Sequence, residues 1–189
     1  MKESPGNHSR VVVRPVDPAD ADRLGAVLAE AYVAGGVIDE HDGYVPALRD
    51  VAGRLARVVA VLAAYDGGEV LGGLTLVAAG TPEAEVARPG ELEIRMLAVD
   101  PRHQGRKVAD ALLGGAEELA RSGGYEALVL SSLPSMPPAH RAYRRYGFER
   151  VPERDWLADW DPQAVADGTA ETLSVYRLPL PPPGARLTR

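Results

Sequence analysis

The stretch that decides the fold is ELEIRMLAVDPRHQGRKVADALL, residues 91–113. Residues 91–99 are predicted to form a strand, and a helix after the turn is predicted to run to about Ser122, where Gly123 and Gly124 end it. The turn between them is rich in glycine and basic residues. A helix start presents unpaired backbone N–H groups and the positive end of the helix dipole, so this turn is suited to hold a phosphate or a pyrophosphate.

The rest of the chain supplies the other elements of one domain. Strands are predicted at residues 10–16, 58–65, 69–78, 126–132 and 172–178 and from about 147 onward, with helices at about 17–32, 46–56 and 138–146 and an irregular segment at 152–171. This order predicts a mixed α/β (α+β) fold, with a mostly antiparallel sheet of six to seven strands and helices on both faces. We expect the domain to span residues 10–178, between a flexible tail at 1–9 and a proline-rich tail at 179–189.

The composition narrows the classes of function. With 189 residues, a hydrophobic share of 46% and a net charge of −6, the chain is typical of one globular domain, and its acidity argues against general nucleic-acid binding. The absence of cysteine excludes thiolate catalysis and Cys-zinc sites, and the four scattered histidines have no metal-ligand spacing, so we expect no metal. Without a membrane-spanning run or a signal-peptide pattern, we expect no membrane partner and a cytoplasmic location.

The element order and the 91–113 stretch together resemble the GNAT superfamily of acetyl-CoA-dependent N-acetyltransferases, over about residues 10–178. The family pattern after the strand is Gln/Arg-x-x-Gly-x-Gly/Ala, and the matching residues here are Gln104, Gly105, Arg106, Val108 and Ala109. The resemblance implies that the backbone of residues 104–109 holds the pyrophosphate of acetyl-CoA. The alternative is an ordinary helix start with a solvated basic cluster.

Lys107 departs from the family pattern, because it stands where the family has its first glycine. A lysine keeps its backbone N–H, so the cradle can survive. If the position needs a positive φ, however, Lys107 costs affinity, and its ammonium would partly offset that cost by pairing with phosphate.

The strand before the turn carries the next set of expectations. The resemblance assigns Leu97, Ala98 and Val99 to the pantetheine arm of the cofactor, with the Leu97 amide polarising the acetyl carbonyl. Strand alternation predicts that Glu93 shares a face with Leu97 and Val99. Glu93 also matches the position of the general base in some histone-acetylating relatives, with Glu91 a weaker candidate. The alternative for Glu93 is an ordinary salt-bridged strand face.

A second motif, AHRAYRRYGF at residues 139–148, resembles the short helix of the family that ends in Tyr-x-x-x-Gly-Phe. Tyr143 aligns with the tyrosine that protonates the departing CoA thiolate in many members, a role that suits a phenol. Tyr146 competes for this role, and Tyr143 could instead be a core aromatic.

Two acidic loops, at residues 39–42 and 155–161, are expected to flank the acceptor side. The candidate acceptor-binding residues are Asp39, His41, Trp156 and Asp159, and their charge predicts a cationic amine. We expect the acceptor to be a small-molecule amine or a protein lysine. A homodimer is a further expectation, because dimers are common in the family. The rival interpretations are a non-catalytic acyl-CoA-binding module and a transferase that uses another acyl-CoA.

Overall fold

The computed structural model describes residues 11–158 and 165–181 of the chain. In this part, one sheet runs in the order β1-β2-β3-β4-β5-β8-β6, and β7 pairs with β8. The strands are β1 Val12–Pro15, β2 Ala60–Asp66, β3 Glu69–Ala78, β4 Glu91–Val99, β5 Ala127–Ser132, β6 Glu149–Arg150, β7 Trp156–Leu157 and β8 Thr172–Pro179. The helices are η1 Pro18–Asp20, α1 Ala21–Ala34, α2 Val45–Arg49, α3 Val51–Leu55, η2 Pro101–His103, α4 Val108–Ser122, α5 Pro137–Tyr146 and η3 Pro152–Arg154.

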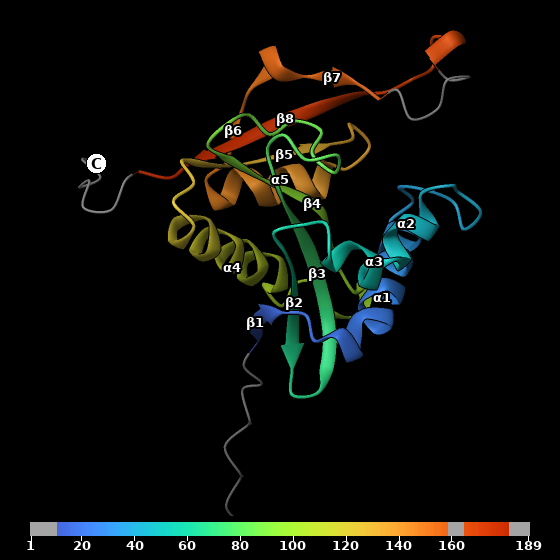
Figure 1. The fold of residues 1–189 in the computed structure, drawn as a ribbon. Helices are drawn as coiled ribbons and strands as arrows, with labels where there is room; N and C mark the ends of the chain where they lie inside the picture. The colour runs from blue at the N-terminus through green and yellow to red at the C-terminus, as the bar shows by residue number, and fades with distance from the viewer. Residues whose placement is uncertain (1–10, 159–164, 182–189) are drawn as a thin grey trace, which may run out of the picture.

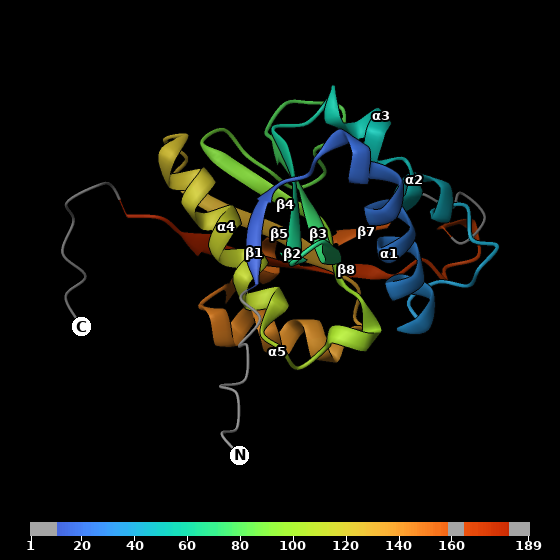
Figure 2. The same cartoon turned by 90° about the horizontal axis from the view of Figure 1, so that it is seen from below.

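Helices cover both faces of this sheet. Figure 1 shows α4 and α5 on one side and α1, α2 and α3 on the other, and Figure 2 shows the same layers from below. Two apolar cores fill the layers. One contains Leu112 and Leu113 of α4 against Leu92 and Ile94 of β4, and the other packs residues of α1, including Leu28, against β2. The predicted mixed sheet with helices on both faces is therefore confirmed.

The strands β4 and β5 form the parallel pair of the sheet, and they pair only at their beginnings. The paired residues are Glu91 to Glu93 with Ala127 to Val129. The other ladders between described strands are antiparallel, including the β2–β3 hairpin and the long β5–β8 pair. Because β4 and β5 separate after three residue pairs, their later backbone groups are available to a ligand.

Three segments differ from the sequence prediction. The helix expected at 46–56 is two short helices, because Asp50 leaves the helical conformation at ψ 59° and its carboxylate accepts a hydrogen bond from Gly53 N at 2.9 Å, which starts α3. The segment 152–171, expected to be irregular, contributes η3 and the short strand β7. The fold also extends past residue 178, since Leu180 is buried and its N–H donates to Glu126 O. The two expected tails fall largely outside the described residues.

None of the helices within residues 11–158 and 165–181 combines the length and the apolarity needed to cross a bilayer.

Candidate functional site

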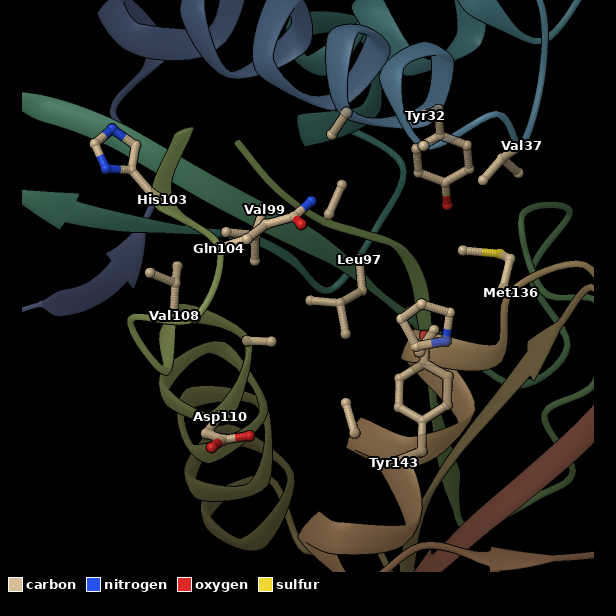
Figure 3. A pocket seen from close by; sticks show the side chains of 18 of the residues that line it. Tyr32, Val37, Leu97, Val99, His103, Gln104, Val108, Asp110, Met136 and Tyr143 are labelled. Atoms are coloured by element: carbon tan, nitrogen blue, oxygen red, sulfur yellow. The ribbon is translucent and has the colours of Figure 1, made fainter. Parts of the chain in front are cut away.

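A cavity of about 620 Å³ opens where β4 leaves β5. Its lining residues come from the end of α1, the end of β4, the following turn, the start of α4 and α5 with the loop before it, as Figure 3 shows in part. Of the residues expected to bind the cofactor, the following line it: Leu97, Ala98, Val99, Gln104, Gly105, Lys107, Val108, Ala109 and Tyr143. Segments that are distant in sequence thus meet at one elongated site of a size typical for small-molecule pockets.

The turn before α4 has the backbone of an anion cradle. Gly105 has φ 80°, and Lys107, directly before the helix, has φ 60° and ψ 22°. The first N–H groups of α4 have no acceptor within the helix and lie at the positive end of its dipole. Lys107 therefore occupies the left-handed conformation that glycine adopts without strain, so the lysine does not prevent the turn from taking a backbone conformation suited to an anion.

Arg106 braces this turn instead of lining the cavity. Its Nη2 lies 2.6 Å from Asp66 Oδ2 of the β2–β3 hairpin, and its Nη1 donates to His103 Nδ1 at 2.9 Å. His103 Nε2 in turn lies 3.1 Å from Glu69 Oε1. The side chain of Arg106, expected at the cofactor, thus ties the turn to the hairpin, and only its backbone is left for a phosphate.

A β-bulge in β4 overturns the predicted face of Glu93. The register with β3 shifts between Gly73 and Thr75, and Met96 has φ 54°. Before the bulge, the even-numbered Leu92 and Ile94 belong to the α4-side core; after it, the odd-numbered Leu97 and Val99 pack there. The extra residue inverts the alternation, so Glu93 faces away from Leu97 and Val99.

Glu93 is engaged with a loop. Its side chain is buried, with 1% exposed, and Oε2 accepts hydrogen bonds from the backbone N of Glu85, Val86 and Ala87 at 2.9, 2.9 and 3.0 Å. It does not line the cavity. This arrangement disfavours Glu93 as a general base and indicates that its carboxylate shapes the loop between β3 and β4.

Glu91, the weaker candidate, is also engaged elsewhere. Its carboxylate accepts from Arg154 Nη2 at 2.8 Å and from Arg177 Nε at 2.7 Å. Burial acts to raise the pKa of Glu91, but the hydrogen bonds from Arg154 and Arg177 outweigh it and lower that pKa from 4.5 to about 2. A carboxylate this acidic is a poor proton acceptor near neutral pH.

Tyr143, the predicted proton donor, lies on α5 and lines the cavity. Only 6% of it is exposed, and its ring packs against Tyr176 and Phe148 with centroids 5.7 and 6.1 Å apart. Burial, and to a lesser degree the neighbouring Tyr176, raises the pKa of Tyr143 well above 10, so the phenol keeps its proton. The competitor Tyr146 donates its hydroxyl to Glu117 Oε2 at 2.8 Å, away from the large cavity.

The end of the cavity beyond Leu97 is formed by residues that the sequence did not single out. They are Tyr32 at the end of α1, Val37 just after it, and Met136 before α5. In Figure 3 the hydroxyl groups of Tyr32 and Tyr143 point toward each other across this end, with Met136 beside them. The amphipathic pattern of α1 indicated a core face, but it gave no sign that this helix ends at the site.

The expected acceptor-binding residues are not brought into the cavity. Asp39 and His41 are exposed in the loop after α1, and the Asp39 carboxylate accepts from His41 N at 2.7 Å. Trp156 lies in β7 and is also absent from the cavity lining, whereas Asp159 lies outside the described residues. Within residues 11–158 and 165–181, no group of three or more His, Asp or Glu side chains is arranged to hold a metal.

The profile of the Acetyltransferase (GNAT) family matches residues 28–148. Among curated proteins, none gives a significant match.

Solved structures share the fold at low sequence identity. An N-acetyltransferase from Staphylococcus aureus Mu50 superposes with a TM-score of 0.64 at 18% identity, covering 92% of this chain and 100% of its own. PaiA N-acetyltransferase from Thermoplasma acidophilum, in complex with coenzyme A, gives 0.64 at 15% identity, over 89% and 99%. A GNAT family acetyltransferase from Brucella melitensis, in complex with acetyl-CoA, gives 0.59 at 20% identity, over 93% and 91%.

Proposed function

We propose that this chain, which belongs to the GNAT family of acetyltransferases, transfers an acetyl group directly from acetyl-CoA to a primary amine. The observation that carries the proposal is the continuity of one cavity, from the anion cradle before α4, along the free edge of β4, to the hydroxyl of Tyr143. A phosphate seat at one end and a proton donor at the other suit a long thioester whose sulfur must leave as a thiol.

The chain offers acetyl-CoA a complementary surface along the whole cavity. The backbone N–H groups from Gly105 to Ala109 face the pyrophosphate, and the positive φ of Gly105 and Lys107 supports that arrangement. The edge of β4 at Leu97 and Val99, unpaired on the β5 side, suits the amide groups of the pantetheine arm. The relatives from Thermoplasma acidophilum and Brucella melitensis, which hold coenzyme A and acetyl-CoA, support this assignment.

The chemistry then follows from what acetyl-CoA supplies, an acetyl group on a sulfur leaving group. The amine nitrogen forms a bond to the carbonyl carbon, and the Leu97 N–H stabilises the negative charge that develops on the carbonyl oxygen. When the carbon–sulfur bond breaks, the electron pair goes to sulfur and the Tyr143 hydroxyl donates a proton to it. The nitrogen releases a proton that restores the phenol, so that overall one amine proton ends on the CoA thiol. The chain has no cysteine, so the acetyl group is not carried on a cysteine thiol and passes directly from CoA to the amine.

The test is a screen of acceptor amines that follows free CoA, with mass spectrometry to identify the acetylated product. We expect CoA release that depends on the amine and exceeds the hydrolysis measured without it. The screen is repeated with propionyl-CoA and succinyl-CoA, because a preference for either would change the donor and leave the site in place. Tight acetyl-CoA binding with no amine-dependent release would support the non-catalytic alternative instead.

A further inference from the structure

The end of the cavity next to Tyr143 is apolar. Beyond Leu97 it is lined by the half-buried side chains of Ala31, Val37 and Met136 and by the Tyr32 ring. The Tyr32 ring packs against Tyr44, with centroids 6.1 Å apart, which fixes one wall. In Figure 3 the two phenol hydroxyls of Tyr32 and Tyr143 converge here. The lining also includes the exposed Ser135, next to Met136.

Charged side chains among the described lining residues gather at the opposite end. They are His103, Lys107, Asp110 and Arg145, close to the turn and the start of α4. Asp110 contributes the one carboxylate of the described lining, and Arg145 Nη2 lies 2.7 Å from its Oδ1. Among the described lining residues, none places a carboxylate at the Tyr32 end that could pair with an ammonium there.

The described residues of the acidic loops do not compensate for this. Asp39 and Asp42 use their carboxylates to accept backbone N–H groups of their own loop, and Asp155 is held by two hydrogen bonds of 2.6 Å from Arg150. Arg95, whose charge acts on both Tyr32 and Tyr44, is itself a cation and pairs with Glu85. The described charges near this end thus give a second ammonium no partner.

An apolar end also bears on how the amine loses its proton. A charged ammonium that enters an apolar site loses hydration, so its pKa falls and the neutral, nucleophilic form gains population. The Tyr32 hydroxyl oxygen can accept one hydrogen bond from the neutral amine without demanding a charge. Because Glu93 is committed to the loop backbone, the ammonium releases its proton to solvent water as it enters, without a carboxylate base.

From this geometry we infer that the acceptor is a primary amine attached to an apolar body, an alkyl or aryl group, and that Tyr32, Val37 and Met136 select it against polyamines and other multiply charged amines. The inference rests on the proposed acetyl transfer and specifies its acceptor class. It replaces the cationic acceptor that the net charge had suggested.

The test compares hexylamine with 1,5-diaminopentane, which have the same number of heavy atoms and differ in that a terminal methyl becomes a second ammonium. We expect kcat/KM for hexylamine to be at least tenfold higher, and 2-phenylethylamine to behave like hexylamine. Each value is measured by CoA release at saturating acetyl-CoA and moderate salt.

Three valine variants then locate the origin of the preference. Val37→Asp introduces a carboxylate at the apolar end and should reduce the ratio by tenfold or more. Val37→Asn introduces a side chain of nearly the same size as aspartate but without the charge, and should reduce the ratio less. Val59→Asp is the matched control, because Val59 is 42% exposed and does not line the cavity, so the wild-type ratio should persist. The acetyl-CoA affinity and the thermal unfolding of each variant are also measured, to verify that each variant is folded.

The outcomes separate this inference from the proposed function. If amines are acetylated but diaminopentane is used as well as hexylamine, or if Val37→Asp leaves the ratio unchanged while binding acetyl-CoA, the acceptor class is wrong and acetyl transfer stands. If no amine accelerates CoA release from wild-type protein, the proposed function and the inference both fail.

Discussion

Replacing Glu93 distinguishes a loop anchor from a general base. The buried Glu93 carboxylate accepts three charge-assisted hydrogen bonds from part-buried backbone N–H groups. A hydrogen bond to a charged group contributes about 1.5–3 kcal/mol, and buried N–H groups left without an acceptor cost about 1–3 kcal/mol each. Because three bonds that share one oxygen are not additive, we expect Glu93→Ala to lower the free energy of unfolding by about 4 kcal/mol. Glu93→Gln keeps an acceptor oxygen but loses its charge, so about 2 kcal/mol is expected.

The assay pairs urea unfolding with the pH profile of kcat/KM for Glu93→Gln. A lost general base would reduce the rate by about 10²–10⁴ and remove the corresponding limb of the profile. We expect instead that kcat/KM per folded molecule stays within about threefold of wild type with an unchanged profile, while the urea midpoint falls. Glu118→Gln, a change on the exposed face of α4, is the control and should alter neither. A variant with wild-type stability and a hundredfold loss of activity would refute the reasoning.

Three further changes test other parts of the account. Tyr143→Phe should lower kcat about tenfold or more with acetyl-CoA affinity nearly unchanged, as steady-state kinetics and calorimetry will show, because the phenol donates only to the departing sulfur; an unchanged chemical step would contradict this. Lys107→Gly and Lys107→Ala both lose the ammonium and should bind acetyl-CoA about two- to fivefold more weakly. The glycine variant should be about 1 kcal/mol more stable to urea than the alanine variant, since only alanine keeps the left-handed strain at φ 60°; equal stability would contradict this. The pKa of Glu91, lowered from 4.5 to about 2, implies about 3 kcal/mol of stability that is present above pH 4.5 and is lost as the pH falls toward 2. Unfolding curves of wild type and Glu91→Gln should therefore converge over that pH window, and a constant gap would contradict the assignment.

The layered architecture was predictable because hydrophobic periodicity and turn residues record it directly. The strand-turn-helix of residues 91–122 and the Gly123–Gly124 stop appear where expected, with the turn at the cavity. The short strand β7 was missed because two residues are too few for a periodic pattern.

The details of the site depended on features that leave no periodic signal. The bulge at Met96 adds one residue to β4, and this single insertion moves Glu93 to the other face from Leu97. Whether Lys107 takes a positive φ depends on how the turn meets α4, which its identity does not determine. Tyr32 reaches the cavity because the end of α1 borders the same cavity as α5 and the loop before it, a tertiary arrangement that the pattern of α1 cannot encode.

The most direct measurement of the central claim is a crystal structure of the protein with acetyl-CoA. The account predicts the pyrophosphate within hydrogen-bond distance of the backbone N atoms from Gly105 to Ala109, the acetyl oxygen at Leu97 N, and the sulfur beside the Tyr143 hydroxyl. Acetyl-CoA bound with its pyrophosphate elsewhere, or with its thioester away from Tyr143, would contradict it.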